Sequence, residues 1–196
     1  SKAVLTGSPI RQELFSGNKE EGLRLCGFDD SKPVLLVMGG SLGAVAINNS
    51  IRENLNELLK QFQIIHLCGR GHYDASLDGT KGYKQFEYAK KELTHLFAAT
   101  DLIISRAGAN AICELLALKK PNIPASQSRG DQLLNADSFE KSGYSYVLQE
   151  EELTSNTLLK AVQYVYDERE EYIQTLKESK LNRAIPIIMN LIQKHP

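Results

Sequence analysis

Apolar residues along this chain fall into two spacings, one typical of buried strands and one typical of helices. Short continuous apolar or β-prone runs predict strands at residues 33–38, 63–68, 83–88, 102–105, 122–123 and 144–148. Spacing of three to four residues predicts helices at residues 44–62, 92–99, 109–118 and 131–142. Strands and helices therefore alternate. This alternation predicts an α/β fold with a doubly wound, mostly parallel, Rossmann-like sheet.

The two ends of the chain differ from this alternating region. Residues 3–14 combine a short β-prone piece, a Gly-Ser-Pro turn and a helix start, with Arg11 in the first turns of that helix. Residues 154–196 have helical spacing only, with Thr154 as the expected N-cap and Pro186 as a helix start or kink. We expect one domain over residues 1–196, with the helical tail belonging to it.

Composition narrows the class of protein. Of the 196 residues, 23 are basic and 24 acidic, so no overall charge favours a nucleic acid partner. The three cysteines lack a CxxC or other metal spacing, which favours reduced thiols in a cytosolic protein. No apolar run approaches the roughly 20 residues of a membrane span. The chain is expected to be cytoplasmic, and its abrupt start is consistent with a piece of a longer protein.

The first candidate binding element is GGSLGA, residues 39–44, at a predicted strand-to-helix turn. Glycines permit a tight turn and close backbone approach, and a helix N-terminus favours a phosphate. Ser41 adds a hydroxyl donor. The motif is neither GxGxxG nor a P-loop, so it predicts phosphate binding without ATP hydrolysis; a purely structural glycine turn is the alternative.

The second candidate is SRAGANAICE, residues 105–114, at another strand-to-helix turn. Glu114 lies four residues after Asn110, hence on the same helical face. A carboxylate beside such a turn can accept hydrogen bonds from both ribose hydroxyls. The alternative is that Glu114 only neutralises a neighbouring helix terminus.

Other polar residues carry weaker signals. Asp131 can cap a helix on which Gln132 and Asn135 share one face, and paired amides suit a ligand rich in hydroxyls; an ordinary polar helix start is the alternative. Arg11 can reach a diphosphate or be a solvated surface charge. The four histidines are scattered without metal spacing, and no catalytic base is evident. We therefore predict no metal site and no cofactor.

In this order and at these separations, TGSPIR, MGGSLGA, SRAGANAICEL and GDQLLNA resemble the carboxyl-terminal half of the MurG family. These are bacterial transferases that move N-acetylglucosamine (GlcNAc) from UDP-GlcNAc onto lipid I, making lipid II for peptidoglycan. The resemblance implies the donor-binding half of a two-domain GT-B enzyme. The amino-terminal half would carry the acceptor site, the general base and the membrane-docking surface, so the whole enzyme would lie on the inner face of the cell membrane.

The resemblance also implies residue roles. Arg11 and Ser41 would lie near the diphosphate, surrounded by the backbone of Gly39, Gly40 and Gly43. Glu114 would hold the ribose, while Asn110 and Ala111 would line the site by their backbone. Gln132 would contact the sugar with Asn135 close behind, and residues 88–93, beginning with Tyr88, would line the uracil pocket.

Two segments depart from the family pattern. YAKKEL, residues 88–93, stands where the family often has a Phe-Ile-Asp-Asp-Met-like run. The stretch before the glutamine motif, residues 121–132, is shorter than is usual in the family.

The mechanism implied for the whole enzyme is an inverting displacement at the anomeric carbon, with helix N-termini and Arg11 stabilising the departing UDP. This chain alone is expected to bind UDP or UDP-GlcNAc without transferring sugar. Three other functions remain open at this point: a donor subunit of a two-chain GlcNAc transferase, a UDP-GlcNAc epimerase, and a nucleotide-sensing module.

Overall fold

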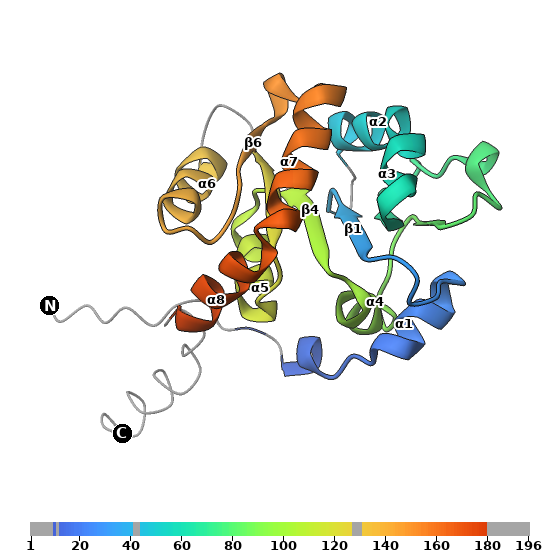
Figure 1. Ribbon diagram of the computed structural model, residues 1–196, viewed down its shortest axis with the longest axis horizontal. Helices are drawn as coiled ribbons and strands as arrows, with labels where there is room; N and C mark the ends of the chain where they lie inside the picture. The colour runs from blue at the N-terminus through green and yellow to red at the C-terminus, as the bar shows by residue number, and fades with distance from the viewer. Residues whose placement is uncertain (1–9, 11, 41–43, 127–130, 180–196) are drawn as a thin grey trace, which may run out of the picture.

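A computed structural model describes residues 10, 12–40, 44–126 and 131–179 of the chain (Figure 1). Its six strands are β1 (Val34–Met38), β2 (Gln63–Leu67), β3 (Tyr83–Phe86), β4 (Leu102–Arg106), β5 (Asn122–Ser126) and β6 (Leu148–Gln149). Its α-helices are α1 (Lys19–Cys26), α2 (Val45–Glu53), α3 (Leu55–Gln61), α4 (Leu93–Ala99), α5 (Ala109–Leu118), α6 (Asp131–Lys141), α7 (Ser155–Asp167) and α8 (Arg169–Glu178). Short 3-10 helices are η1 (Gln12–Phe15), η2 (Ala75–Leu77) and η3 (Glu150–Glu152).

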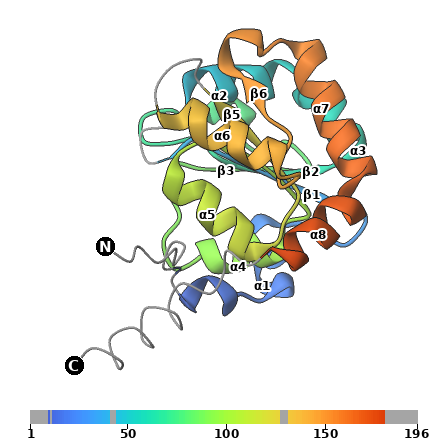
Figure 2. The same cartoon turned by 90° about the vertical axis from the view of Figure 1, so that its left-hand side faces the viewer.

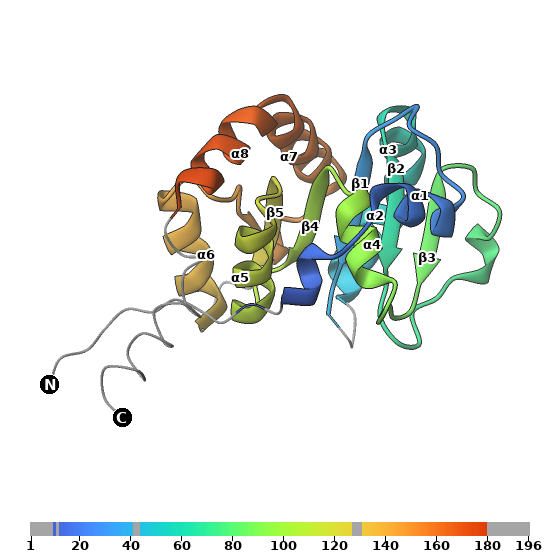
Figure 3. The ribbon, with the colours of Figure 1, turned by 90° about the horizontal axis from the view of Figure 1, so that it is seen from below.

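All six strands pair in parallel, in the order β3-β2-β1-β4-β5-β6. Figure 3 shows β3, β2, β1, β4 and β5 side by side in this order. This is the strand order of the doubly wound dinucleotide-binding folds. The predicted fold class is therefore confirmed.

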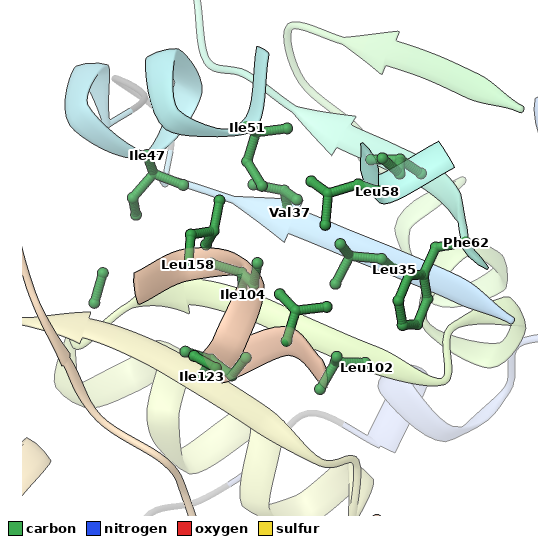
Figure 4. Packing of buried hydrophobic residues seen from close by; sticks show 14 of the residues in the cluster. Leu35, Val37, Ile47, Ile51, Leu58, Phe62, Leu102, Ile104, Ile123 and Leu158 are labelled. Atoms are coloured by element: carbon green, nitrogen blue, oxygen red, sulfur yellow. The ribbon is translucent and has the colours of Figure 1, made fainter. Parts of the chain in front are cut away.

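Helices cover both faces of the sheet, giving three layers (Figure 2). On one face, α2, α3 and α7 pack on every second residue of the central strands, including Leu35, Val37 and Ile104 (Figure 4). On the other face, η1, α1, α4 and α5 pack on the alternate positions, including Leu36 and Ile103. Because successive strand residues point to opposite faces, the continuous apolar runs of the sequence fill two cores at once. Each fully buried Leu or Ile contributes roughly 1.5–3 kcal/mol.

Helices α1 and α4 approach each other through glycine. A Cβ added at Gly22 would lie 2.2 Å from the His95 carbonyl oxygen, and one at Gly17 would lie 2.0 Å from the Thr94 carbonyl oxygen. The backbone amide of Asn18 also donates to Nδ1 of His95 at 3.1 Å. These glycines fix how closely α1 covers α4.

Two predicted elements are wrong in detail. The single helix expected over residues 44–62 is two helices, because the Asn54 side chain donates to the Ser50 carbonyl at 2.7 Å and Asn54 leaves helical geometry. The strand expected over residues 144–148 shortens to β6. Before β6, the Asn122 side chain donates to the Tyr144 carbonyl at 3.2 Å and accepts from the Ser145 hydroxyl at 2.6 Å. Tyr146 donates one backbone bond to the Asn122 carbonyl at 3.2 Å, so side-chain bonds take the place of most of the strand ladder.

The helical tail begins as predicted. The Thr154 side chain accepts from the Thr157 amide, and the Thr157 hydroxyl accepts from the Thr154 amide, forming a capping box. Helices α7 and α8 then follow, separated at Glu168. The segment at residues 3–9 and Pro186 lie outside the described residues.

Candidate functional site

The strand order creates a topological switch point between β1 and β4, and we call the region outside the carboxyl ends of these two strands the crevice. From β1 the chain continues to β2 on one side, whereas β4 lies on the other side and leads to β5. The connections that leave β1 and β4 therefore diverge, and ligands of such sheets bind in the gap at the carboxyl ends of the strands. Met38 and Ser105 are register partners, so GGSLGA and SRAGANAICE leave the sheet from adjacent strands. The structure brings the two predicted turns together.

The turn after β1 begins with two glycines of different character. Gly39 is buried, whereas Gly40 is exposed with φ +83°, a conformation that only glycine adopts readily. Helix α2 follows with Ala44 as its N-cap, which has no polar side chain to occupy the first-turn amides. Ser41 and Gly43 lie outside the described residues. The start of α2 is thus equipped to donate hydrogen bonds to an anion.

The turn after β4 has the same construction. The N-cap of α5 is Gly108, which again offers no capping side chain. Its φ of −70° is accessible to any residue, and a Cβ placed there would meet no atom of the described residues within 4 Å. Neither the backbone conformation nor the packing of the described residues explains a glycine here. Open space beside a helix start leaves room for a ligand.

The nucleoside-contacting residues predicted on α5 follow this turn directly. Ala111 and Glu114 are both half-buried, and Asn110 belongs to the first turn of the helix. The side chain of Asn110 lies outside the described part of the structure, as do those of Gln132 and Asn135 on α6. Since β5 pairs with β4, its carboxyl end places the start of α6 at the same edge of the sheet.

Tyr88 lies in the connection from β3 to α4 and is 60% exposed. Its ring is 5.9 Å from the Nζ atom of Lys90. Residues 88–91 and 93–95 line a cavity of about 800 Å³ together with Glu13 and Leu14 of η1 and the following Ser16. This volume is in the range of small-molecule pockets. Strand β3 is three interstrand spacings from β4, roughly 14 Å. Only an extended ligand can therefore occupy both this cavity and the crevice. Arg11 lies outside the described residues.

Sequence reasoning missed a charged pair at the same edge. Nε of Arg106, the last residue of β4, lies 3.3 Å from Oε1 of Glu150 in η3, with side chains 32% and 16% exposed. The orientation of these atoms does not meet the geometry of a hydrogen bond, so the contact is an ion pair only. The position of Arg106 directly after an apolar run could have indicated from the sequence that this side chain lies at the sheet edge. No sequence pattern indicated its partner Glu150, which lies 44 residues further along. The ion pair with Glu150 keeps the positively charged Arg106 side chain beside the turn at Gly108.

The remaining titratable groups have structural settings. His66 is fully buried, His95 accepts a bond from the Asn18 amide, and His195 lies outside the described residues. Cys26 and Cys68 are buried free thiols, as predicted, and burial raises the pKa of Cys26 to about 12. Within residues 10–179 as described, no group of three His, Cys, Asp or Glu side chains is placed to hold a metal ion. The absence of a metal requirement stays a prediction.

The comparison that decides the family is a match to the glycosyltransferase family 28 C-terminal domain, over residues 34–191. The chain belongs to this family. The matched region of the family 28 domain contains both turns of the crevice and helices α2, α5 and α6. The predicted resemblance to the carboxyl-terminal half of the MurG family is thereby confirmed.

Curated relatives agree with the family 28 assignment. A protein of Lachnoclostridium phytofermentans is 58% identical over 197 residues, covering 98% of this chain and 56% of the relative. A protein of Clostridium tetani is 55% identical over 198 residues, covering 99% of this chain and 55% of the relative. Both are named UDP-N-acetylglucosamine–N-acetylmuramyl-(pentapeptide) pyrophosphoryl-undecaprenol N-acetylglucosamine transferase. The chain spans about half the length of the curated relatives it matches.

Solved structures share the fold of the family 28 domain. The crystal structure of Acinetobacter baumannii MurG has a TM-score of 0.73 at 22% identity, covering 92% of this chain and 55% of that one. A glycosyltransferase of kitacinnamycin has a TM-score of 0.66 at 20% identity, covering 83% and 43%. Identities this low establish the shared fold alone.

Proposed function

We propose that this chain binds UDP-N-acetylglucosamine as the donor half of an inverting glycosyltransferase. The whole enzyme would add GlcNAc to lipid I, undecaprenyl-diphosphate-MurNAc-pentapeptide, to form lipid II in peptidoglycan synthesis. The observation that carries this proposal is the pair of helix starts, α2 and α5, that open without capping side chains onto one crevice. The names of relatives that are 55–58% identical supply the donor and the acceptor.

A diphosphate matches the start of α2 in chemistry. Two negatively charged groups can accept bonds from first-turn amides and from the backbone of Gly39, Gly40 and Gly43, and the helix dipole favours them. In this proposal Ser41 and Arg11 add a hydroxyl and a cation. The start of α5 is the next helix terminus along the sheet edge, and in this proposal Glu114 on α5 accepts hydrogen bonds from both ribose hydroxyls.

The sugar and the base would then lie at opposite ends of the diphosphate and ribose. Gln132 and Asn135, on the helix that follows β5, would contact GlcNAc, while Asn110 and Ala111 line the site with their backbone. The cavity beside Tyr88 would take the uracil, the role that the family resemblance implies for residues 88–93.

Transfer would proceed by direct displacement at the anomeric carbon. The acceptor hydroxyl attacks as a base removes its proton, and UDP departs with its charge stabilised by the helix dipoles. We propose that the general base and the acceptor site lie in the part of the relatives that this chain does not span. We propose that no metal or cofactor takes part.

None of the helices in the described part of the chain has the length and apolar character needed to cross a bilayer. Peripheral attachment of the whole enzyme to the inner face of the cell membrane is part of the proposal.

Calorimetric titration of the chain tests donor binding. UDP and UDP-GlcNAc should bind with one-to-one stoichiometry, NAD should not bind, and prior treatment with EDTA should change nothing. Glu114→Ala should weaken UDP by about 10- to 100-fold, the equivalent of about 1.5–3 kcal/mol for bonds to a charged group. Asp137→Ala, on the exposed face of α6, is the matched control and should bind like the parent. Equal affinities for parent and Glu114→Ala would refute the ribose role.

A second assay tests the activity of the whole enzyme. Full-length protein should transfer GlcNAc to a lipid I analogue with inversion, while this chain alone should not. Production of an epimer from UDP-GlcNAc in the absence of acceptor would instead indicate an epimerase.

A further inference from the structure

A directed chain of buried hydrogen bonds connects α2 to the two strands on its side of the sheet. His66 in β2 is fully buried, and both of its ring nitrogens are bonded. Nδ1 lies 2.7 Å from the Tyr83 hydroxyl in β3, and Nε2 lies 2.9 Å from Oδ1 of Asn48 in α2. The Asn48 amide nitrogen is in turn 2.8 Å from the Cys68 carbonyl, just after β2. We call these three side chains the His66 relay.

The direction of every bond in the His66 relay follows from its last member. A carbonyl accepts only, so Asn48 must donate to Cys68 through Nδ2, which leaves Oδ1 as its acceptor. His66 must then donate from Nε2 and accept at Nδ1 from the Tyr83 hydroxyl. One neutral tautomer satisfies all three bonds. Burial accordingly lowers the pKa of His66 to about 3, with the nearby Arg52 acting in the same direction.

The His66 relay attaches to α2 close to the helix start. Asn48 is the fourth residue of α2, and Arg52, one turn later, donates to the His72 carbonyl and to Oε1 of Gln85 at 3.0 Å. On the core side of the same helix, Ile47 and Ile51 are buried against the sheet. Apolar contacts alone allow a helix to slide or rotate at small cost, whereas a bond to a fixed carbonyl does not. The polar bonds therefore set the register of α2 on the sheet.

We propose that the His66 relay is a positioning device, which holds the first-turn amides of α2 in place for the diphosphate of the donor. This inference rests on the proposed function. Ala44 and Val45, the residues that open α2, cannot anchor it by polar side chains, and Val45 is exposed. The nearest polar anchor is Asn48, less than one turn along. We do not propose that Asn48 or His66 contacts the sugar nucleotide. Both residues act by holding α2 in place.

The test compares two ligands rather than one. Uridine carries the base and the ribose of the donor without the phosphates, so the ratio of the uridine Kd to the UDP Kd isolates the phosphate contribution. NMR titrations should give this ratio for the parent chain, Asn48→Leu and His66→Gln. We expect the ratio to fall about tenfold or more in both variants, because small misplacements of binding groups are costly, while the uridine Kd stays within twofold. Amide hydrogen exchange at residues 44–48 should speed up in parallel.

Ser145→Ala is the matched control, since it removes a buried bond of 2.6 Å to Asn122 far from α2. It should lower thermal stability and leave the ratio unchanged. Should Asn48→Leu and His66→Gln fail to fold, Tyr83→Phe carries the test, because it keeps the ring and loses only the hydroxyl; its ratio should still fall. An unchanged ratio in the folded variants would overturn the positioning role. A parent chain that binds neither ligand would overturn the proposed function itself, and the positioning role with it.

Discussion

The buried neutral state of His66 predicts a specific dependence of stability on pH. An unfolded histidine takes up a proton as the pH falls through 6.5, whereas folded His66 does so only near pH 3. Between these values the unfolded state binds more protons, so acidification lowers the free energy of unfolding. The loss begins near pH 6.5 and grows by about 1.4 kcal/mol for each further pH unit.

Between pH 7.5 and pH 5.0 the expected loss from this one group is about 2 kcal/mol. The figure depends on the unfolded pKa alone, because pH 5.0 is well above the folded pKa of about 3. Urea unfolding followed by far-UV circular dichroism measures it, since the chain has no tryptophan to report by fluorescence. His66→Gln provides the reference. Subtracting its pH dependence of the free energy of unfolding from that of the parent chain removes the contribution of distant carboxylates, which both proteins share. If both proteins lose the same stability over this range, His66 is not held neutral in the fold.

Three further perturbations test the packing and the crevice. Gly22→Ala should lower the free energy of unfolding by about 1–3 kcal/mol, since its new Cβ meets the His95 carbonyl; Glu20→Ala, exposed on the same helix, should cost far less in the same urea assay. Gly108→Ala should leave the melting temperature within a degree or two, because the added Cβ meets no atom of the described residues, yet weaken UDP in calorimetry; unchanged UDP affinity would mean that no ligand approaches this turn. Thr154→Ala should cost about 1 kcal/mol through the loss of the capping box, and Thr154→Ser should restore most of it; equal stability of all three proteins would contradict the capping role.

The sheet and its two turns were predictable because their signals are local. Continuous apolar runs such as residues 33–38 can be buried only between two layers of helices, so the run itself indicates a central parallel strand. Glycines at the end of such a run indicate the turn. The adjacency of the two turns then follows from the doubly wound topology, and the register of Met38 with Ser105 confirms it.

Features that depend on partners distant in the sequence were not predictable. The break at Asn54 and the short β6 both arise where an asparagine side chain bonds backbone groups in place of a regular ladder. The spacing of apolar residues in the sequence does not reveal such side-chain bonds. The Arg106–Glu150 pair and the His66 relay join segments brought together only by folding. A lone histidine in a strand has the same local pattern whether its partners are solvent or a buried asparagine.

The most direct test of the account is the titration of this chain with UDP. Helices α2 and α5 start at adjacent strands without capping side chains. A nucleoside diphosphate is the ligand that we propose for both. We predict one UDP bound per chain, with amide shifts concentrated at residues 44–48 and 108–114. A folded chain that gives no heat and no shifts with UDP would contradict the assignment of a donor site to this crevice.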